Sequence, residues 1–138
     1  MNPLVPLILA GALLWFLMGN SSQLSPNYGL ADLTVTSTGL PNDPGPVEVA
    51  NLRKLATDIL EPLAARTTFI ITSGYRSPAV NSHPSVNGAT NSHHMAGNAV
   101  DLVPLQLTPQ QLADLADELA LPLDELLVYE KHVHFSRA

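Results

Sequence analysis

The sequence predicts an α+β fold, in which helices pack on one face of a small antiparallel sheet. The first observation is the order of the patterns, which runs helix, strand, loop, strand, helix and then one or two closing strands. The second is the short connection between the last two extended segments, because a few residues can join only antiparallel neighbours. The third is the stretch 74–98, rich in Gly, Asn, Ser and Pro, which predicts a long loop of the kind that often carries function.

The helices follow from apolar spacing and from capping signals. Apolar residues three and four apart predict a helix over about residues 47–65. Thr108 as N-cap, with Gln111 at the capping-box position, begins a second helix that Pro122 closes. A short helix is expected after Pro78 within the long loop.

The strands follow from β-branched and apolar runs. The run TTFIITS predicts a strand over residues 67–73, and AVDLV predicts another over 99–103. Residues 125–136 predict one or two closing strands. No internal repeat is visible, and the length of 138 residues fits a single domain.

The chain divides into a leader, a linker and this domain. Residues 1–20 hold an apolar run without charge, shorter than the ~20 residues of a usual membrane span, and predict a signal peptide or membrane anchor. A buried core helix is the alternative, which the prolines and glycines of the run disfavour. Residues 21–32 are polar and turn-rich and predict a linker, which leaves 33–138 as the domain.

Composition excludes several classes of site. Six Lys and Arg residues stand against twelve Asp and Glu, without a basic cluster, so no nucleic-acid partner is expected. The chain has no cysteine, so a metal would have to be held by His and carboxylate side chains.

The first candidate cluster lies around the strand AVDLV. Asp101 stands inside this apolar strand, where a carboxylate is costly unless a metal ion or a buried hydrogen-bond network compensates it. Gly97 permits a turn between His94 and the strand, so that both side chains can face one point. The spacing alone leaves the metal ion and the hydrogen-bond network open.

The second cluster lies near the C-terminus. In a strand, residues two apart share a face, so His132 and His134 point the same way, and Glu130 joins them if the strand is unbroken. The opposite face would place Tyr129, Val133 and Phe135 in the core. Two His and one carboxylate form the usual open zinc site, and the alternative is a solvated edge strand.

Three blocks in this order resemble the peptidase M15 family of D-alanyl-D-alanine carboxypeptidase-type metallopeptidases, and most closely its short bacterial and phage branch. The blocks are SGYRSP at 73–78 followed by Asn81, the pattern S-x-H-x-x-G-x-A-x-D at 92–101, and HVHFS at 132–136. The combination is far more specific than any single block. The resemblance covers about residues 33–138 and implies a hedgehog/D-Ala-D-Ala peptidase-like fold whose long loop lines the active site.

The resemblance also implies roles for single residues. His94, Asp101 and His134 would be ligands of Zn²⁺. Arg76 would bind a substrate carboxylate or carbonyl, with a salt bridge that closes the loop as the alternative. Ser92 would orient the site or contact substrate.

The remaining implied roles are catalytic. His132 would stabilise the transition state. The family's acid often stands three residues before the last ligand, where this chain has Lys131. Glu130 is therefore the predicted general base, with Glu125 and Asp124 as more distant candidates.

Together these features imply a zinc-dependent peptidase that hydrolyses an amide bond in peptidoglycan stem peptides or cross-bridges, in wall remodelling or as a phage endolysin. We expect a monomer that is exported, periplasmic or membrane-anchored facing the wall, with membrane contact only through residues 1–20. The alternatives are a non-catalytic zinc-binding or wall-binding module on the same fold and a membrane-active lysis protein that acts through its leader. The bond is left open among D-Ala-D-Ala, L-Ala-D-Glu and a cross-bridge.

Overall fold

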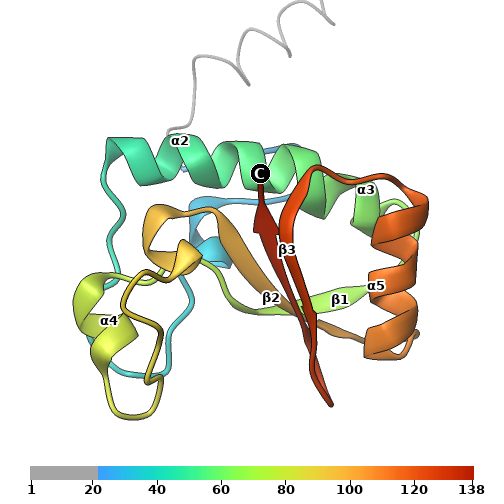
Figure 1. Ribbon diagram of the computed structural model, residues 1–138. Helices are drawn as coiled ribbons and strands as arrows, with labels where there is room; N and C mark the ends of the chain where they lie inside the picture. The colour runs from blue at the N-terminus through green and yellow to red at the C-terminus, as the bar shows by residue number, and fades with distance from the viewer. Residues whose placement is uncertain (1–21) are drawn as a thin grey trace, which may run out of the picture.

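A computed structural model describes residues 22–138, and the predicted leader lies outside them. Its centre is a four-stranded antiparallel sheet in the order β1-β2-β4-β3 (Figure 1). The strands are β1 (Phe69–Ser73), β2 (Ala99–Pro104), β3 (Leu123–Val128) and β4 (Val133–Arg137). The predicted α+β class, with an antiparallel sheet, is confirmed.

The helix predicted over 47–65 is confirmed as one run with an irregular middle. It consists of α2 (Pro46–Leu55), a wide π turn η2 (Ala56–Leu60) and α3 (Glu61–Ala64). In the wide turn the Glu61 N–H donates to the Ala56 carbonyl, five residues back. Pro62 follows at once, and since proline lacks an N–H and clashes with an α-helical turn before it, the widened turn accommodates it.

The other two helices also begin where their capping signals stand. α4 (Pro78–Ser82) follows the N-cap Ser77, and α5 (Pro109–Glu118) follows Thr108. In α5 the Gln111 N–H donates to Thr108 Oγ1 (3.1 Å), and the Thr108 N–H donates to Gln111 Oε1 (2.9 Å). The predicted capping box is confirmed.

The hydrophobic core forms on one face of the sheet. Alternate residues of β2 and β4 are fully buried there against apolar side chains of α2, α3 and α5: Val100, Leu102, Val133, Phe135, Leu52, Leu63 and Leu112. Because successive strand residues point to opposite faces, the residues between them, Asp101 and His134, point away from this core. The sheet therefore separates the core from the predicted site.

The closing segment forms a hairpin of β3 and β4 rather than one strand. Tyr129 N–H donates to the His132 carbonyl (2.9 Å) and closes a turn over 129–132. Glu130 is therefore on an exposed turn and does not continue the face of His134. Tyr129 is 48% exposed, so its predicted place in the core is wrong, and the turn is the reason.

The segment predicted as a linker packs against the domain from residue 22 onward. Leu24 is 1% exposed and belongs to the core. Ser25 Oγ donates to Glu61 Oε1 (2.6 Å), and the Asn27 N–H donates to the same oxygen (2.8 Å). The 3-10 turn η1 (Leu30–Leu33) follows and buries Leu33. Within residues 22–138, no helix has the length and apolar character needed to cross a membrane.

Candidate metal centre

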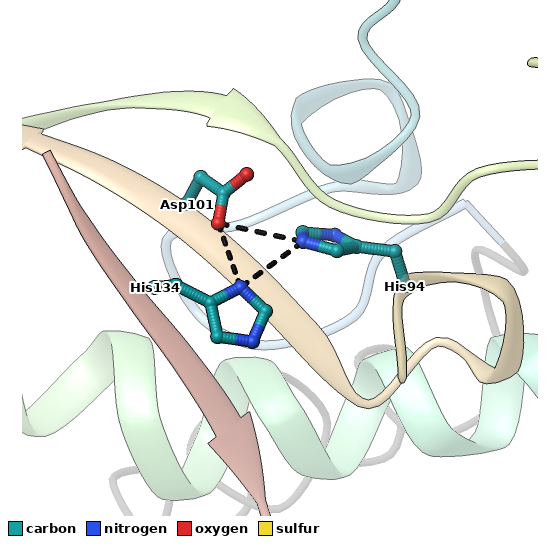
Figure 2. A group of neighbouring side chains, drawn as sticks. All are labelled: His94, Asp101 and His134. Atoms are coloured by element: carbon teal, nitrogen blue, oxygen red, sulfur yellow. Dashed lines mark hydrogen bonds and ion pairs between the residues drawn. The ribbon is translucent and has the colours of Figure 1, made fainter. Parts of the chain in front are cut away.

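Three side chains from three elements converge on one point (Figure 2). Asp101 of β2 lies directly opposite His134 of β4 in the sheet register, and its Oδ1 is 2.9 Å from His134 Nδ1. His94 comes from the 3-10 turn η3 (His93–Ala96) that precedes β2. Its Nε2 lies 3.2 Å from His134 Nδ1 and 3.4 Å from Asp101 Oδ1. The structure thus brings together the three predicted zinc ligands.

The spacing of these three atoms fits a tetrahedral zinc ion. Zinc bonds imidazole nitrogen and carboxylate oxygen at about 2.0–2.2 Å, so two ligand atoms at the corners of a tetrahedron stand about 3.3 Å apart. The observed separations of 2.9, 3.2 and 3.4 Å bracket this value. Three protein ligands leave a fourth position for water or substrate, as catalytic zinc sites do.

His94 is oriented by contacts on both its ring and its backbone. It is 2% exposed, and its Nδ1 is 2.6 Å from the Gly74 carbonyl, which can only accept, so Nδ1 donates. In the neutral ring this leaves the lone pair on Nε2, the atom that faces the cluster. The His94 N–H donates to Ser92 Oγ (3.2 Å), and the His94 carbonyl accepts from the Arg76 N–H (3.1 Å).

His134 has a carboxylate near its second ring nitrogen. Nε2 lies 3.0 Å from Glu125 Oε1 in β3, but the contact is not aligned as a hydrogen bond. This buried nitrogen therefore has no hydrogen-bond partner among residues 22–138.

Asp101 is ionised by its neighbours in spite of its burial. Burial raises the pKa of its carboxyl, but the close contacts with the rings of His134 and His94 outweigh this and hold the pKa well below its usual range. Asp101 Oδ2 also lies 3.2 Å from Arg76 Nη2, and Arg76 Nε donates to Ser73 Oγ (2.9 Å). The salt bridge considered as an alternative for Arg76 therefore forms, with Asp101 as its partner.

A cavity of about 470 Å³ opens over this cluster, which is large enough for part of a peptide. Arg76, Ser92 and His132 line it, as expected from the sequence, and the His132 ring stacks on Tyr129 (centroids 4.5 Å apart). Glu125 lines the cavity, whereas Glu130 does not.

A family model described as Peptidase M15 matches residues 25–136. The chain belongs to the peptidase M15 family. The match includes His94, Asp101 and His134. It begins at residue 25, within the segment 22–32 that was predicted as a linker and packs against the domain. A search of curated proteins finds no match for the chain.

Two residues of the M15 site were missed or ranked low from sequence. Glu125 was only a distant candidate for the base. In the hairpin Leu127 lies opposite His134, and Glu125, two residues before Leu127, is on the same face of the strand and so beside His134. No sequence pattern points to the Gly74 carbonyl, because every residue has a backbone carbonyl. A Cβ at Gly74 would lie 2.5 Å from the Leu33 carbonyl oxygen, so the close approach of the two backbones requires glycine there.

Proposed function

We propose that the chain is a zinc-dependent peptidase that hydrolyses an amide bond in peptidoglycan stem peptides or cross-bridges. The observation that carries the proposal is the convergence of His94 Nε2, Asp101 Oδ1 and His134 Nδ1 at zinc-ligand spacing within a cavity. Membership of the peptidase M15 family supports a metallopeptidase. The substrate class rests on the resemblance to wall peptidases.

Zinc held by these ligands would polarise the scissile carbonyl and lower the pKa of a water molecule toward about 7. The protein's own part is to position the substrate and to move a proton. The Arg76 guanidinium and the His132 ring line the cavity, and both can donate to the developing negative charge. Gly74 and Ser92 hold His94 in place.

The carboxylate in the cavity is the better candidate for the general base. Glu125 lies beside His134 and lines the cavity, so it can accept a proton from the attacking water and return it to the leaving amine. Glu130 stands on the exposed turn.

A matched pair of variants separates the two glutamates. We expect Glu125→Gln to lower kcat for peptidoglycan hydrolysis by about 10²–10⁴-fold, since the amide cannot accept the proton. Glu130→Gln, the control, should change kcat less than about twofold, because surface substitutions away from a site have small effects. Zinc content should stay the same in both variants. Loss of activity in Glu130→Gln alone would assign the base to Glu130.

A non-catalytic zinc-binding or wall-binding module is the second candidate, favoured by Lys131 at the usual acid position. Digestion of purified peptidoglycan decides between the two. The zinc-loaded protein should release new amino groups and peptide fragments, detected by amine labelling and mass spectrometry. Protein stripped by a chelator should release none until zinc is returned. An intact wall in the presence of zinc-loaded protein would leave only the binding module.

The proposed substrate lies outside the cytoplasmic membrane, so the protein must reach the wall. We propose that residues 1–20 act as an export signal or anchor and that the domain works as a monomer, without a nucleic-acid partner. The uncharged, apolar character of residues 3–18 supports this role.

A further inference from the structure

Asn81 follows the first motif block, yet it is not among the residues that line the cavity over the metal centre. It lies in α4 and is only 4% exposed. Its side chain contacts the loop 83–91, because Nδ2 donates to the Ala89 carbonyl (2.9 Å). The burial of this amide and its one side-chain hydrogen bond indicate that Asn81 acts on the loop.

Gly88 fits closely against the same amide. The Gly88 N–H donates to the Asn81 carbonyl (2.8 Å), which is a second bond between α4 and the loop. A Cβ added at Gly88 would overlap Asn81 Oδ1 and lie 2.6 Å from Asn81 Cγ. The Asn81 amide therefore cannot move toward Gly88 without displacing the loop.

A continuous chain of hydrogen bonds leads from Asn81 to the metal ligand His94. The Ala89 carbonyl that accepts from Asn81 also accepts from the Ser92 N–H (3.1 Å). Ser92 Oγ in turn accepts from the His94 N–H (3.2 Å). Ser92 is the N-cap of η3, the turn that carries His94, so the position of its hydroxyl determines where this turn begins.

We propose that Asn81 is a positioning residue for the zinc ligand His94. It acts through the Ala89 carbonyl and the Ser92 hydroxyl and contacts neither the metal ion nor the substrate. The proposal rests on the proposed function only in taking His94 as a ligand of zinc. It gives a physical reason why the first two motif blocks occur together, because Asn81 beside one block orients the ligand in the other.

The variant Asn81→Leu removes the amide and keeps its approximate shape. Asn81 Oδ1 has no hydrogen-bond partner among residues 22–138, so leucine removes one hydrogen bond together with one unpartnered acceptor, and the fold should tolerate it. We expect the Kd for zinc, measured by calorimetry, to rise about tenfold, as when a group that orients a metal ligand is lost. Asn27→Leu is the matched control, because it removes an amide hydrogen bond to Glu61 Oε2 (2.7 Å) outside the cavity. Its Kd should stay within about twofold of wild type.

The variant Gly88→Ala disturbs the same contact from the loop and serves as a second test, should Asn81→Leu fold poorly. The added Cβ should push the amide away from the Ala89 carbonyl and also raise the Kd for zinc about tenfold. In the background of Asn81→Ala no amide is left to be displaced. There, Gly88→Ala should change the Kd less than about twofold further.

A second measurement needs no zinc. The buried Nδ1–H of His94 donates to the Gly74 carbonyl (2.6 Å), and the NMR signal of this proton reports the position of the ring. We expect the signal to shift or broaden in Asn81→Leu and in Gly88→Ala and to stay in place in Asn27→Leu. An unchanged Kd or an unchanged His94 signal in both variants would overturn the proposal. If wild type binds no zinc, the proposed function fails, and the His94 signal alone decides the role of Asn81.

Discussion

Replacing Asp101 with alanine is expected to remove zinc binding and amide hydrolysis together. Asp101 Oδ1 is one corner of the cluster and contacts the facing atoms of both His134 and His94. The apparent free energy of zinc binding in proteins is about 10 kcal/mol or more. If three or four ligands share it, each contributes roughly 3 kcal/mol, so loss of one ligand should raise the Kd for zinc on the order of 100-fold. Hydrolysis should fall in parallel.

Zinc titration followed by calorimetry measures the affinity, and thermal unfolding with and without zinc gives an independent check. Bound zinc should raise the Tm of wild type but not that of the variant. Asp101→Asn keeps the size of the side chain beside Arg76 and serves as a second variant, should the alanine variant fold poorly. Asp117→Ala, on the exposed face of α5, is the control. Unchanged zinc affinity in both Asp101 variants would remove the proposed site.

Gly97→Ala is expected to destabilise the fold beside the site, because it combines a backbone cost with a steric clash. Gly97 has φ +75°, and an added Cβ would lie 2.6 Å from the Glu48 carbonyl oxygen and 3.2 Å from Leu52 Cγ. The left-handed backbone costs alanine about 1–2 kcal/mol, and overpacking against a fixed helix adds about 1–3 kcal/mol. The same clash should push η3, which carries His94, away from α2 and weaken zinc binding.

Gly39→Ala is a matched control for the backbone cost. Gly39 has φ +74°, but nothing lies within 4 Å of the added Cβ. Its free energy of unfolding, measured in urea, should fall by only about 1–2 kcal/mol with zinc affinity unchanged. Equal losses in the two variants would show that α2 yields to the clash and that the Gly97 contact does not position His94.

Much of the fold was predictable because its signals are local. The capping box of Thr108 and Gln111 and the apolar spacing of the first helix depend only on neighbouring residues. Leu24 shows the limit of this approach. A single apolar side chain in a polar segment has no periodic pattern to mark it as buried. Its segment is held on the domain by contacts with residues far along the chain, such as the hydrogen bond from the neighbouring Ser25 to Glu61.

The residues of the candidate site also differ in how far the sequence could predict them. His94, Asp101 and His134 stand in motif blocks, so their residue types and spacing identified them as candidate zinc ligands. Glu125 belongs to no block, and it reaches the cavity only because the turn over 129–132 folds β3 back onto β4. The same turn removes Glu130 from the face of His134, which the sequence could not exclude while the strand boundary was unknown.

The central claim is that His94, Asp101 and His134 hold zinc, and X-ray absorption at the zinc edge tests it most directly. Wild type loaded with one equivalent of zinc should show the multiple scattering of two imidazoles, with nitrogen and oxygen ligands at about 2.0–2.2 Å in a four-coordinate site. Asp101→Asn should alter or lose this spectrum. A spectrum of zinc surrounded by oxygen alone, without imidazole scattering, would contradict the account.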